Sequence, residues 1–435
     1  MKPFTRLLAV LCMLVLAAGA GTISPLSSVR AQNTTAKHSN VTLTFWHYFT
    51  DRAKLFNQFA AQYKKQTGVT INMELVSGDV LGQKFQAAAQ AHTLPDISAA
   101  WTGVGDGTAP YAKEGIILNL QNAMSKGWAN QFVKAYLQSA SFPKNNTFGV
   151  KPGPYLVPLD ANNMQFLYNK TLFKQAGIKT TPKTYSELIA DGNKLAKLGV
   201  APFVSGFGSW PMDAYAQPYM WNIVGKANLL KTFNGQMKYT AKPWIDFLTI
   251  FSKMHSSQML AQGILADDLP AAETLFVNGR AGMIFDGSWA IGVFQQQNPG
   301  FKNYGVFFPP SAGKYPLRIP GGVGAMAFVV GTSPHKAEAV KFLQWLTAPK
   351  QQAAYANSSN NLPANKYVVG HVHMTANLTA FSKTMNKIIP SIPKGMLAAV
   401  DTTMDKGLQE ILAGNATPQQ VAALMQKAQD TGLPQ

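Results

Sequence analysis

Residues 41–75 read VTLTFWHYFTDRAKLFNQFAAQYKKQTGVTINMEL, and this stretch decides the fold class. Apolar residues alternate with polar ones over 41–45, which predicts a strand with one buried face. The apolar residues of 55–63 recur at helical spacing, and Gly68 suits the C-terminal cap of that helix. Alternation resumes over 69–75 and predicts a second strand. A strand, a helix and a strand in this order form a βαβ unit, so we expect an α/β protein with parallel sheets.

Helix and strand signals alternate along the rest of the chain. Three capping signals predict helix starts: Thr184 with Glu187, Ser333 with Pro334, and Thr417 with Pro418 and Gln420. Short apolar runs predict buried strands at 282–285, 304–308 and 325–330. Tyr168-Asn169 is expected to join a strand to a helix, and Trp345 is a predicted core residue. A chain of 435 residues is too long for one ordinary core, so we expect at least two domains.

The first 31 residues have the features of an export signal. Lys2 and Arg6 precede an apolar run, Leu7 to Ala20, that is too short to span a bilayer comfortably. Small residues near Ala31 predict cleavage after it, and an uncleaved membrane anchor is the alternative. Cys12, the only cysteine, lies inside the apolar run without the surroundings of a lipid-attachment site. We therefore expect secretion without a lipid, and a polar, disordered mature N-terminus over 32–40.

The chain is strongly basic because it is poor in acids. It has 38 Lys and Arg against 20 Asp and Glu, a formal net charge of +18. Lys64-Lys65 is the only adjacent basic pair, and no basic cluster is interleaved with aromatics, which argues against nucleic-acid binding. Few carboxylates favour life in an acidic milieu, because few groups can titrate as the pH falls. Attraction to an anionic cell envelope is the equal alternative.

No catalytic or metal-binding constellation is evident. His371 and His373 are two ligands without a third nearby, so an exposed loop is the favoured interpretation. The Gly-Ser-Trp of residues 287–289 lacks the glycines that flank the serine of a nucleophile elbow. Paired carboxylates for glycoside hydrolysis stay open, because such a pair need not be adjacent in sequence. We expect no catalysis, no metal and no cofactor.

Five phrases in the chain are together specific. They are residues 43–74, LPDISAAWTGVGDG at 94–107, residues 155–188, FVNGRAGMIFDGSWAIGVF at 276–294, and SPHKAEAVKFLQWL at 333–346. In this order they resemble the extracellular solute-binding proteins of bacterial ABC importers, the family-1 type that includes maltose- and oligosaccharide-binding proteins. The resemblance implies a secreted protein that catches a sugar between two lobes and hands it to a membrane permease.

The resemblance also implies how the lobes divide the chain. In this family the chain passes between the lobes several times, near residues 157–160, 321–324 and 356–363 of this sequence. Each lobe would be a mainly parallel sheet flanked by helices, with the ligand in the cleft between them. The implied ranges are 1–31 for the signal, 32–40 for the N-terminus, 41–157 and 322–356 for lobe one, and 158–321 and 357–435 for lobe two.

Aromatic rings near acids and amides suit a carbohydrate. A sugar has an apolar C–H face that an indole covers and a rim of hydroxyls that polar side chains bind. Trp46 and Asp51 follow the first strand, at the end of the sheet where α/β proteins collect ligands. Core packing is the alternative for Trp46.

The remaining candidates depend on the resemblance. At Trp101, with Asp106 nearby, it implies a sugar-stacking ring. It leaves open whether Asp160 or Asn162 contacts the ligand.

The Gly-Ser-Trp motif is the sharpest match. It implies that Trp289 is the main stacking platform and that Asp286 bonds hydroxyls. Trp210 lies in a loop that contacts ligand in relatives, with core packing as the alternative, and Gly322 permits close backbone approach. Around Met396 the chain lacks the further aromatic of maltose-type relatives, which argues against a long maltodextrin.

We therefore expect a monomeric binding protein for a carbohydrate, with the transmembrane subunits of an ABC permease as partner. Another solute, such as a glycerol phosphodiester, a polyamine or a metal, is the nearest alternative. A polyamine site would need several acids among the aromatics, and these loops show few. A secreted glycoside hydrolase and a basic envelope adhesin are the alternatives from other classes.

Overall fold

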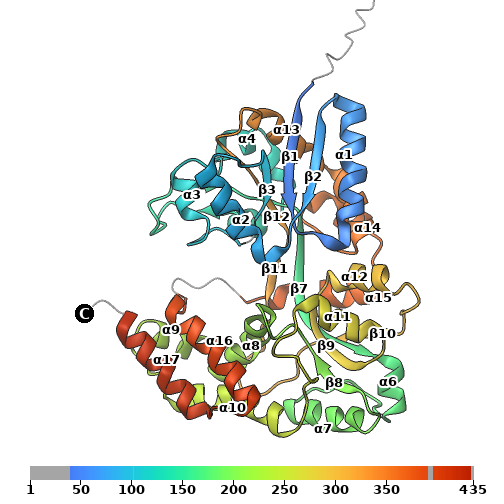
Figure 1. Ribbon diagram of the computed structural model, residues 1–435, viewed down its shortest axis with the longest axis vertical. Helices are drawn as coiled ribbons and strands as arrows, with labels where there is room; N and C mark the ends of the chain where they lie inside the picture. The colour runs from blue at the N-terminus through green and yellow to red at the C-terminus, as the bar shows by residue number, and fades with distance from the viewer. Residues whose placement is uncertain (1–39, 101, 390–394, 433–435) are drawn as a thin grey trace, which may run out of the picture. The chain divides into compact units, whose positions relative to one another are not determined.

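The computed structural model describes residues 40–100, 102–389 and 395–432 (Figure 1). The predicted export signal, the predicted disordered N-terminus up to residue 39, and Trp101 lie outside the described residues. The described residues form one compact body.

The predicted βαβ unit opens the first sheet. Strand β1 (Thr42–His47) pairs in parallel with β2 (Thr70–Leu75), and helix α1 (Ala53–Thr67) joins them. Gly68 caps α1 with φ of 80°, a left-handed conformation that glycine adopts without strain. The five strands run in the order β2, β1, β3 (Ile97–Ala99), β12 (Met326–Val329) and β6 (Val157–Pro158).

Helices cover the first sheet, and we call this unit lobe one. Phe45 of β1 and Phe56 of α1 are fully buried with their ring centroids 5.7 Å apart. Trp345 is only half-buried at the edge of this core, where it stacks on Phe342. The other elements of lobe one are η1 (Thr50–Arg52), α2 (Gly78–Ala91), α3 (Ala109–Lys113), α4 (Gln121–Met124), η2 (Trp128–Gln131), α5 (Lys134–Ser139), β4 (Ser141–Phe142), β5 (Gly153–Pro154), α13 (Lys336–Leu346) and α14 (Pro349–Ser359).

The second sheet is built around one long strand, and with its helices it forms lobe two. Strand β7 (Asp160–Asn169) lies between β10 (Tyr304–Phe307) and β9 (Ala281–Gly287), and β9 pairs with β8 (Ala201–Val204). Strands β11 (Gly321–Val323) and β13 (Leu362–Pro363) also pair with β7.

The prediction of a mainly parallel sheet is wrong for lobe two. Only β8 and β9 pair in parallel there, among the described strands. The reason is the direction of β7, which runs away from lobe one. Strands that run back towards lobe one are therefore antiparallel to it. Asn169 at its end accepts hydrogen bonds from the Thr171 and Leu172 amides and caps α6, which confirms the predicted strand-to-helix junction.

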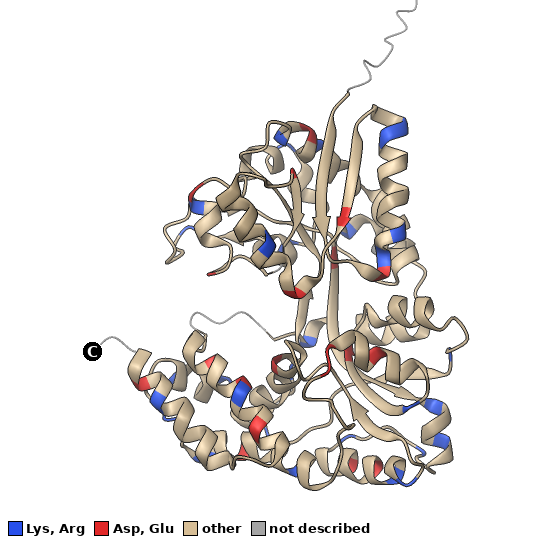
Figure 2. Ribbon diagram, viewed as in Figure 1, with Lys and Arg blue, Asp and Glu red and all other residues tan. Residues whose placement is uncertain are grey.

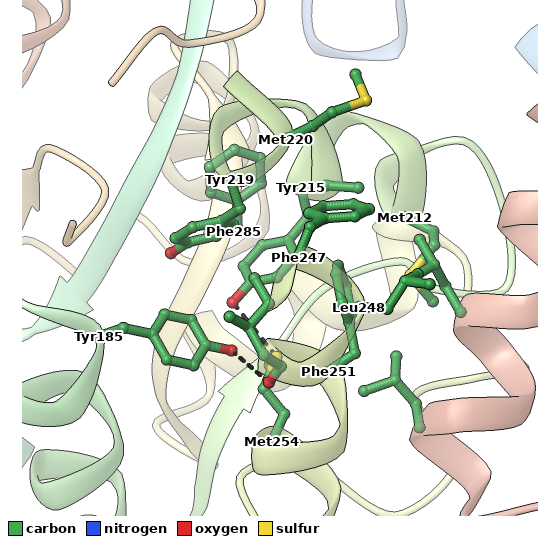
Figure 3. Packing of buried hydrophobic residues seen from close by; sticks show 14 of the residues in the cluster. Tyr185, Met212, Tyr215, Tyr219, Met220, Phe247, Leu248, Phe251, Met254 and Phe285 are labelled. Atoms are coloured by element: carbon green, nitrogen blue, oxygen red, sulfur yellow. Dashed lines mark hydrogen bonds between the residues drawn. The ribbon is translucent and has the colours of Figure 1, made fainter. Parts of the chain in front are cut away.

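The largest core lies among the helices of lobe two. Figure 3 shows Tyr185, Tyr215 and Phe285 packed within it, and the Tyr185 hydroxyl donates to the Ile250 carbonyl at 3.1 Å. Trp244 is fully buried in the same core. The helices of lobe two are α6 (Lys170–Gln175), α7 (Tyr185–Ala196), α8 (Pro211–Ile223), α9 (Lys226–Phe233), α10 (Lys242–Ser256), α11 (Leu269–Val277), α12 (Ala290–Gln297), α15 (Ala376–Ser382), η4 (Met385–Lys387), α16 (Ala398–Ala413) and α17 (Pro418–Gly432). The short helix η3 (Lys366–His371) lies against α14 of lobe one.

Two of the three predicted helix starts are confirmed. Thr184 and Glu187 form the capping box of α7, and Thr417 accepts a hydrogen bond from the Gln420 amide at the start of α17. The third prediction is wrong by two residues, because α13 begins at Lys336. The Ser333 hydroxyl instead accepts from the amide of residue 335 and bonds Asp96, so the chain makes an extra turn before the helix.

The chain passes between the sheets in three places. They lie between β6 and β7, between β11 and β12, and between α14 and β13. Gly324 lies at the second crossing, where a Cβ atom would be 2.1 Å from Oδ1 of Asp160. The exact residue ranges of the two lobes stay a prediction. The pairing of β11 with β7 places Gly322 in the second sheet.

Candidate functional site

A cleft with a volume of about 1730 Å³ lies between the lobes. Small-molecule sites commonly measure roughly 300–1,000 Å³, so this cleft has room for more than one sugar-sized unit. Lobe one lines it with η1 and its neighbours, α2 and α3. Lobe two lines it with the starts of α8, α11 and α12, and with β7 and the segment around β11.

Two tryptophans form an aromatic surface on the lobe two wall. The Trp210 and Trp289 ring centroids are 6.0 Å apart with an interplanar angle of 53°. Trp210 is 49 % exposed, although it lies beside a large core. The Trp289 ring lies so close to Gly287 that a Cβ atom there would be 2.0 Å from it. Glycine at 287 is therefore required for the indole to lie against the end of β9, and the pair offers apolar faces to a ligand.

Two carboxyl groups interact behind this surface. Burial raises the pKa of Asp286 to about 7, although hydrogen bonds from the Gly287 amide, Glu273 and the Trp289 side chain lower it. Burial and the neighbouring Asp286 raise the pKa of Glu273 well above its ordinary value. Glu273 lines the cleft and is only 4 % exposed. Because two buried carboxyls in contact cannot both be ionised, the pair holds a proton at neutral pH.

A buried arginine joins the first crossing to lobe one. The Arg52 Nε donates to Asp51 at 2.8 Å, and its Nη1 pairs with Asp160 and Tyr355. The Tyr355 hydroxyl donates to Asp160 at 2.7 Å, and the Ala325 amide donates to the other carboxylate oxygen at 2.6 Å. Burial raises the pKa of Asp160, whereas Arg52 and these hydrogen bonds lower it. The Asp160 carboxylate is thus fully engaged in the fold.

The lobe one wall is polar and exposed. Gln83, Gln86 and Gln90 lie at helical spacing on one face of α2, and all three line the cleft. Their amides can donate to and accept from hydroxyl groups. The sequence could have indicated this face, because the three glutamines share one side of a predictable helix. It could also have indicated Glu273, which precedes the Gly-Ser-Trp motif.

Five of the predicted site residues line the cleft. They are Asp51, Asp106, Asn162, Trp210 and Trp289. Between Asp160 and Asn162, the structure puts only Asn162 on the cleft surface.

Four other predicted residues are not on the cleft surface. Trp46 is 7 % exposed in the lobe one core, where the Lys84 ammonium lies 4.0 Å from its ring centroid. Asp160 and Asp286 are buried beneath the surface. Gly322 is in β11, paired with Asn162, while its neighbours line the cleft. Trp101 lies outside the described residues.

Within the described ranges, no group of three or more His, Cys, Asp or Glu side chains could hold a metal ion. No helix in the same ranges is long and apolar enough to cross a membrane.

Two α/β lobes joined by three crossings, with one large cleft between them, define a two-lobed binding protein. The profile of the bacterial extracellular solute-binding protein family matches residues 47–353. That range is well over half of the chain, and the protein belongs to this family. The resemblance that the sequence motifs indicated is confirmed.

Relatives with related names support the assignment. A protein of Brucella abortus (strain 2308), named only as a binding protein, is 27% identical over 407 residues, which are 91% of this chain and 93% of that protein. The multiple sugar-binding protein of Streptococcus mutans is 28% identical over 239 residues, 52% of this chain and 55% of that protein. A solved chitin oligosaccharide binding protein has a TM-score of 0.76 at 23% identity, covering 90% of this chain and 99% of that chain. The two-lobed fold predicted from the sequence is confirmed.

Proposed function

We propose that the protein is the carbohydrate-binding component of an ABC importer. It binds an oligosaccharide in the cleft, closes around it, and delivers it to the transmembrane subunits of a permease. A ligand that touches both lobes stabilises the closed state, because that state alone supplies all of the contacts. The names of the relatives support a sugar as ligand, and the family supports a role in transport.

One observation carries the proposal: the Trp210–Trp289 pair faces a cleft whose other wall bears three glutamines. Indole faces bury the C–H surface of a sugar ring, and amides bond its hydroxyls. The size of the cleft favours an oligosaccharide over a single sugar.

The proposal includes location and assembly. The chain is exported, cleaved after Ala31, left without a lipid, and works as a monomer outside the cytoplasm. The lobes comprise residues 41–157 with 322–356, and 158–321 with 357–435. These ranges agree with the crossings to within a few residues, except that β11 pairs in the second sheet.

The carboxyl pair raises hydrolysis as a second function, and its geometry argues against it. Glycoside hydrolases hold their two carboxyls about 5 Å or more apart, with the substrate between them. Glu273 and Asp286 instead lie together beneath the cleft surface and perturb each other's pKa, and Asp286 is fully buried. No glycosidic bond fits between them.

A thermal-shift screen against neutral oligosaccharides of different linkage and length tests the proposal. A sugar that binds only the folded protein stabilises it by about 2.7 kcal/mol when its concentration is a hundred times Kd, and this stabilisation raises the melting temperature. Calorimetry then gives the affinity, and chromatography of the recovered sugar shows whether it is intact. Cleavage of the sugar would establish a hydrolase. A panel that leaves the melting temperature unchanged would contradict carbohydrate binding.

A further inference from the structure

Charge is distributed unevenly between the cleft and the rest of the molecule. Six of the 20 acidic residues line the cleft: Asp51, Asp79, Asp106, Glu114, Asp268 and Glu273. Of the 38 lysines and arginines, only Arg52 is found among the described lining residues. The positive charge of Arg52 is neutralised by its ion pairs with Asp51 and Asp160. A chain of net charge +18 therefore presents a negative cleft.

Three of these carboxylates are unengaged and come from lobe one. Asp79 at the start of α2, and Asp106 and Glu114 on either side of α3, are exposed. None of the three makes an ion pair or accepts a side-chain hydrogen bond within the part of the chain that the structure describes. Their charge is open to a ligand that enters the cleft.

A buried acid on the opposite wall is an independent sign of a ligand group. Glu273 lines the cleft and is 4 % exposed, yet the ionisable group beside it is another acid, Asp286. Burial without a basic partner costs free energy, and the acid lowers this cost by staying protonated. Trp289, beside this pair, adds an aromatic face that attracts cations.

The positive charge of the rest of the chain does not cancel this field. Figure 2 shows Lys and Arg on outer helices such as α1 and α6. Lys84, on α2 next to the cleft, is paired with Glu74. At physiological ionic strength charges further apart than about 8 Å are largely screened from each other. A ligand inside the cleft therefore experiences chiefly the carboxylates that line it.

We infer that the cleft selects carbohydrates by charge, and that its ligand is an oligosaccharide that bears ammonium groups. The Trp210–Trp289 surface holds a sugar ring, and the exposed carboxylates of Asp79, Asp106 and Glu114 attract the amino substituents. Sugars that carry carboxylate, sulfate or phosphate groups are rejected by the same field. This inference deepens the proposed function and depends on it.

Calorimetry with three β-1,4-linked tetrasaccharides of one backbone tests the inference. The probes are the glucosamine tetramer, the neutral glucose tetramer and the glucuronate tetramer, each titrated into the full-length protein at pH 6 and two salt concentrations. We expect the glucosamine tetramer to bind most tightly and to lose about tenfold in affinity from 20 mM to 500 mM salt, because screening weakens exposed charge pairs. The glucuronate tetramer is expected not to bind.

Charge-neutralising variants locate the effect. Asp79→Asn, Asp106→Asn and Glu114→Gln should each weaken binding of the glucosamine tetramer about two- to fivefold, the range for exposed charge pairs. Each should weaken binding of the neutral glucose tetramer less than it weakens binding of the glucosamine tetramer. Asp246→Asn is the matched control, because it removes an equal charge from α10, outside the cleft.

Each result decides something. Glucuronate binding as tight as that of the other tetramers, or no glucosamine binding at millimolar concentration, overturns the charge assignment. Equal effects of Asp246→Asn and Asp106→Asn also overturn it. If neutral oligosaccharides from the wider screen still bind, the proposed carbohydrate function survives this failure. If none binds, both proposals fail together.

Discussion

The two walls of the cleft differ in how their functional groups are held. On the lobe two wall, Trp289 packs on the Gly287 backbone, and Glu273 and Asp286 are buried. On the lobe one wall, Gln86 and Asp106 line the cleft and are exposed. A buried group is coupled to the stability of the fold, whereas an exposed one can change at little cost. Lobe two thus supplies a preformed platform, and lobe one supplies adaptable polar contacts.

Asp160, at the first crossing, is a buried residue whose loss should strongly affect the stability of the fold. Asp160→Ala leaves the buried Arg52 guanidinium with Asp51 as its remaining carboxylate partner, and breaking a buried pair in this way costs up to about 3–5 kcal/mol. We expect the free energy of unfolding from urea titrations to fall by this amount. Asp246→Asn, which disrupts an exposed pair, should change it by less than about 1 kcal/mol. Similar losses in both variants would mean that burial does not set the cost.

The platform itself should govern affinity more than stability. Trp289→Ala removes a large aromatic contact of the kind whose loss costs about 2–4 kcal/mol of binding energy, or ~30-fold or more in Kd. The unliganded melting temperature should change little in comparison with Trp244→Ala, which empties a fully buried site and costs about 3–5 kcal/mol. Trp244 is a better control than Trp345, the predicted core residue, because Trp345 is only half-buried. Calorimetry showing wild-type affinity for Trp289→Ala would exclude it from the site.

Buried carboxyls make stability depend on pH. Burial raises the pKa of Asp213 to about 6, and that of Asp286 and Asp405 to about 7. An unfolded Asp titrates near ~3.9, so between these values the folded state binds more protons than the unfolded state. Stability is therefore fully present at low pH and falls as the pH rises through about 7.

For Asp286 alone the expected loss from pH 5 to pH 8 is on the order of 3 kcal/mol. Melting temperatures across that range measure it, and Asp286→Asn, an uncharged mimic of the protonated acid, should flatten the curve. The sequence suggested a flat profile at acidic pH from the scarcity of acids. A curve that rises towards pH 8 would contradict the pKa shifts.

The smallest effect belongs to the exposed wall. Gln86→Ala removes one amide from α2 and should weaken sugar binding by about 0.5–1.5 kcal/mol, the value of one ordinary hydrogen bond. Its thermal unfolding should match that of the wild type, since the side chain is exposed. A loss as large as that of Trp289→Ala would reverse the roles of the two walls.

Local patterns were enough to predict much of the fold, and the family resemblance indicated part of the site. The βαβ unit followed from periodicity around Gly68, and the capping box at Thr184 followed from residue spacing. The family resemblance indicated Trp289, which lines the cleft, and its role as the stacking platform stays a prediction.

Burial at the crossings could not be predicted in the same way. Asp160 pairs with Arg52, which is far from it in the sequence, and Asp286 lies beside Glu273, which belongs to a different helix, α11. The antiparallel pairs of β7 likewise depend on where the chain crosses between sheets. Periodicity within a segment contains no information on either contact.

The central claim is that a sugar is captured by closure of the two lobes on each other. Cys12 is the only cysteine, so a Cys12→Ser background accepts spin labels at Lys113→Cys on α3 and Lys231→Cys on α9, both exposed. Double electron–electron resonance spectroscopy then gives the distance between the labels. It is measured with and without the oligosaccharide that produces the largest thermal shift. The account predicts a shorter and narrower distance distribution when the sugar is bound. An unchanged distribution at saturating sugar would contradict it.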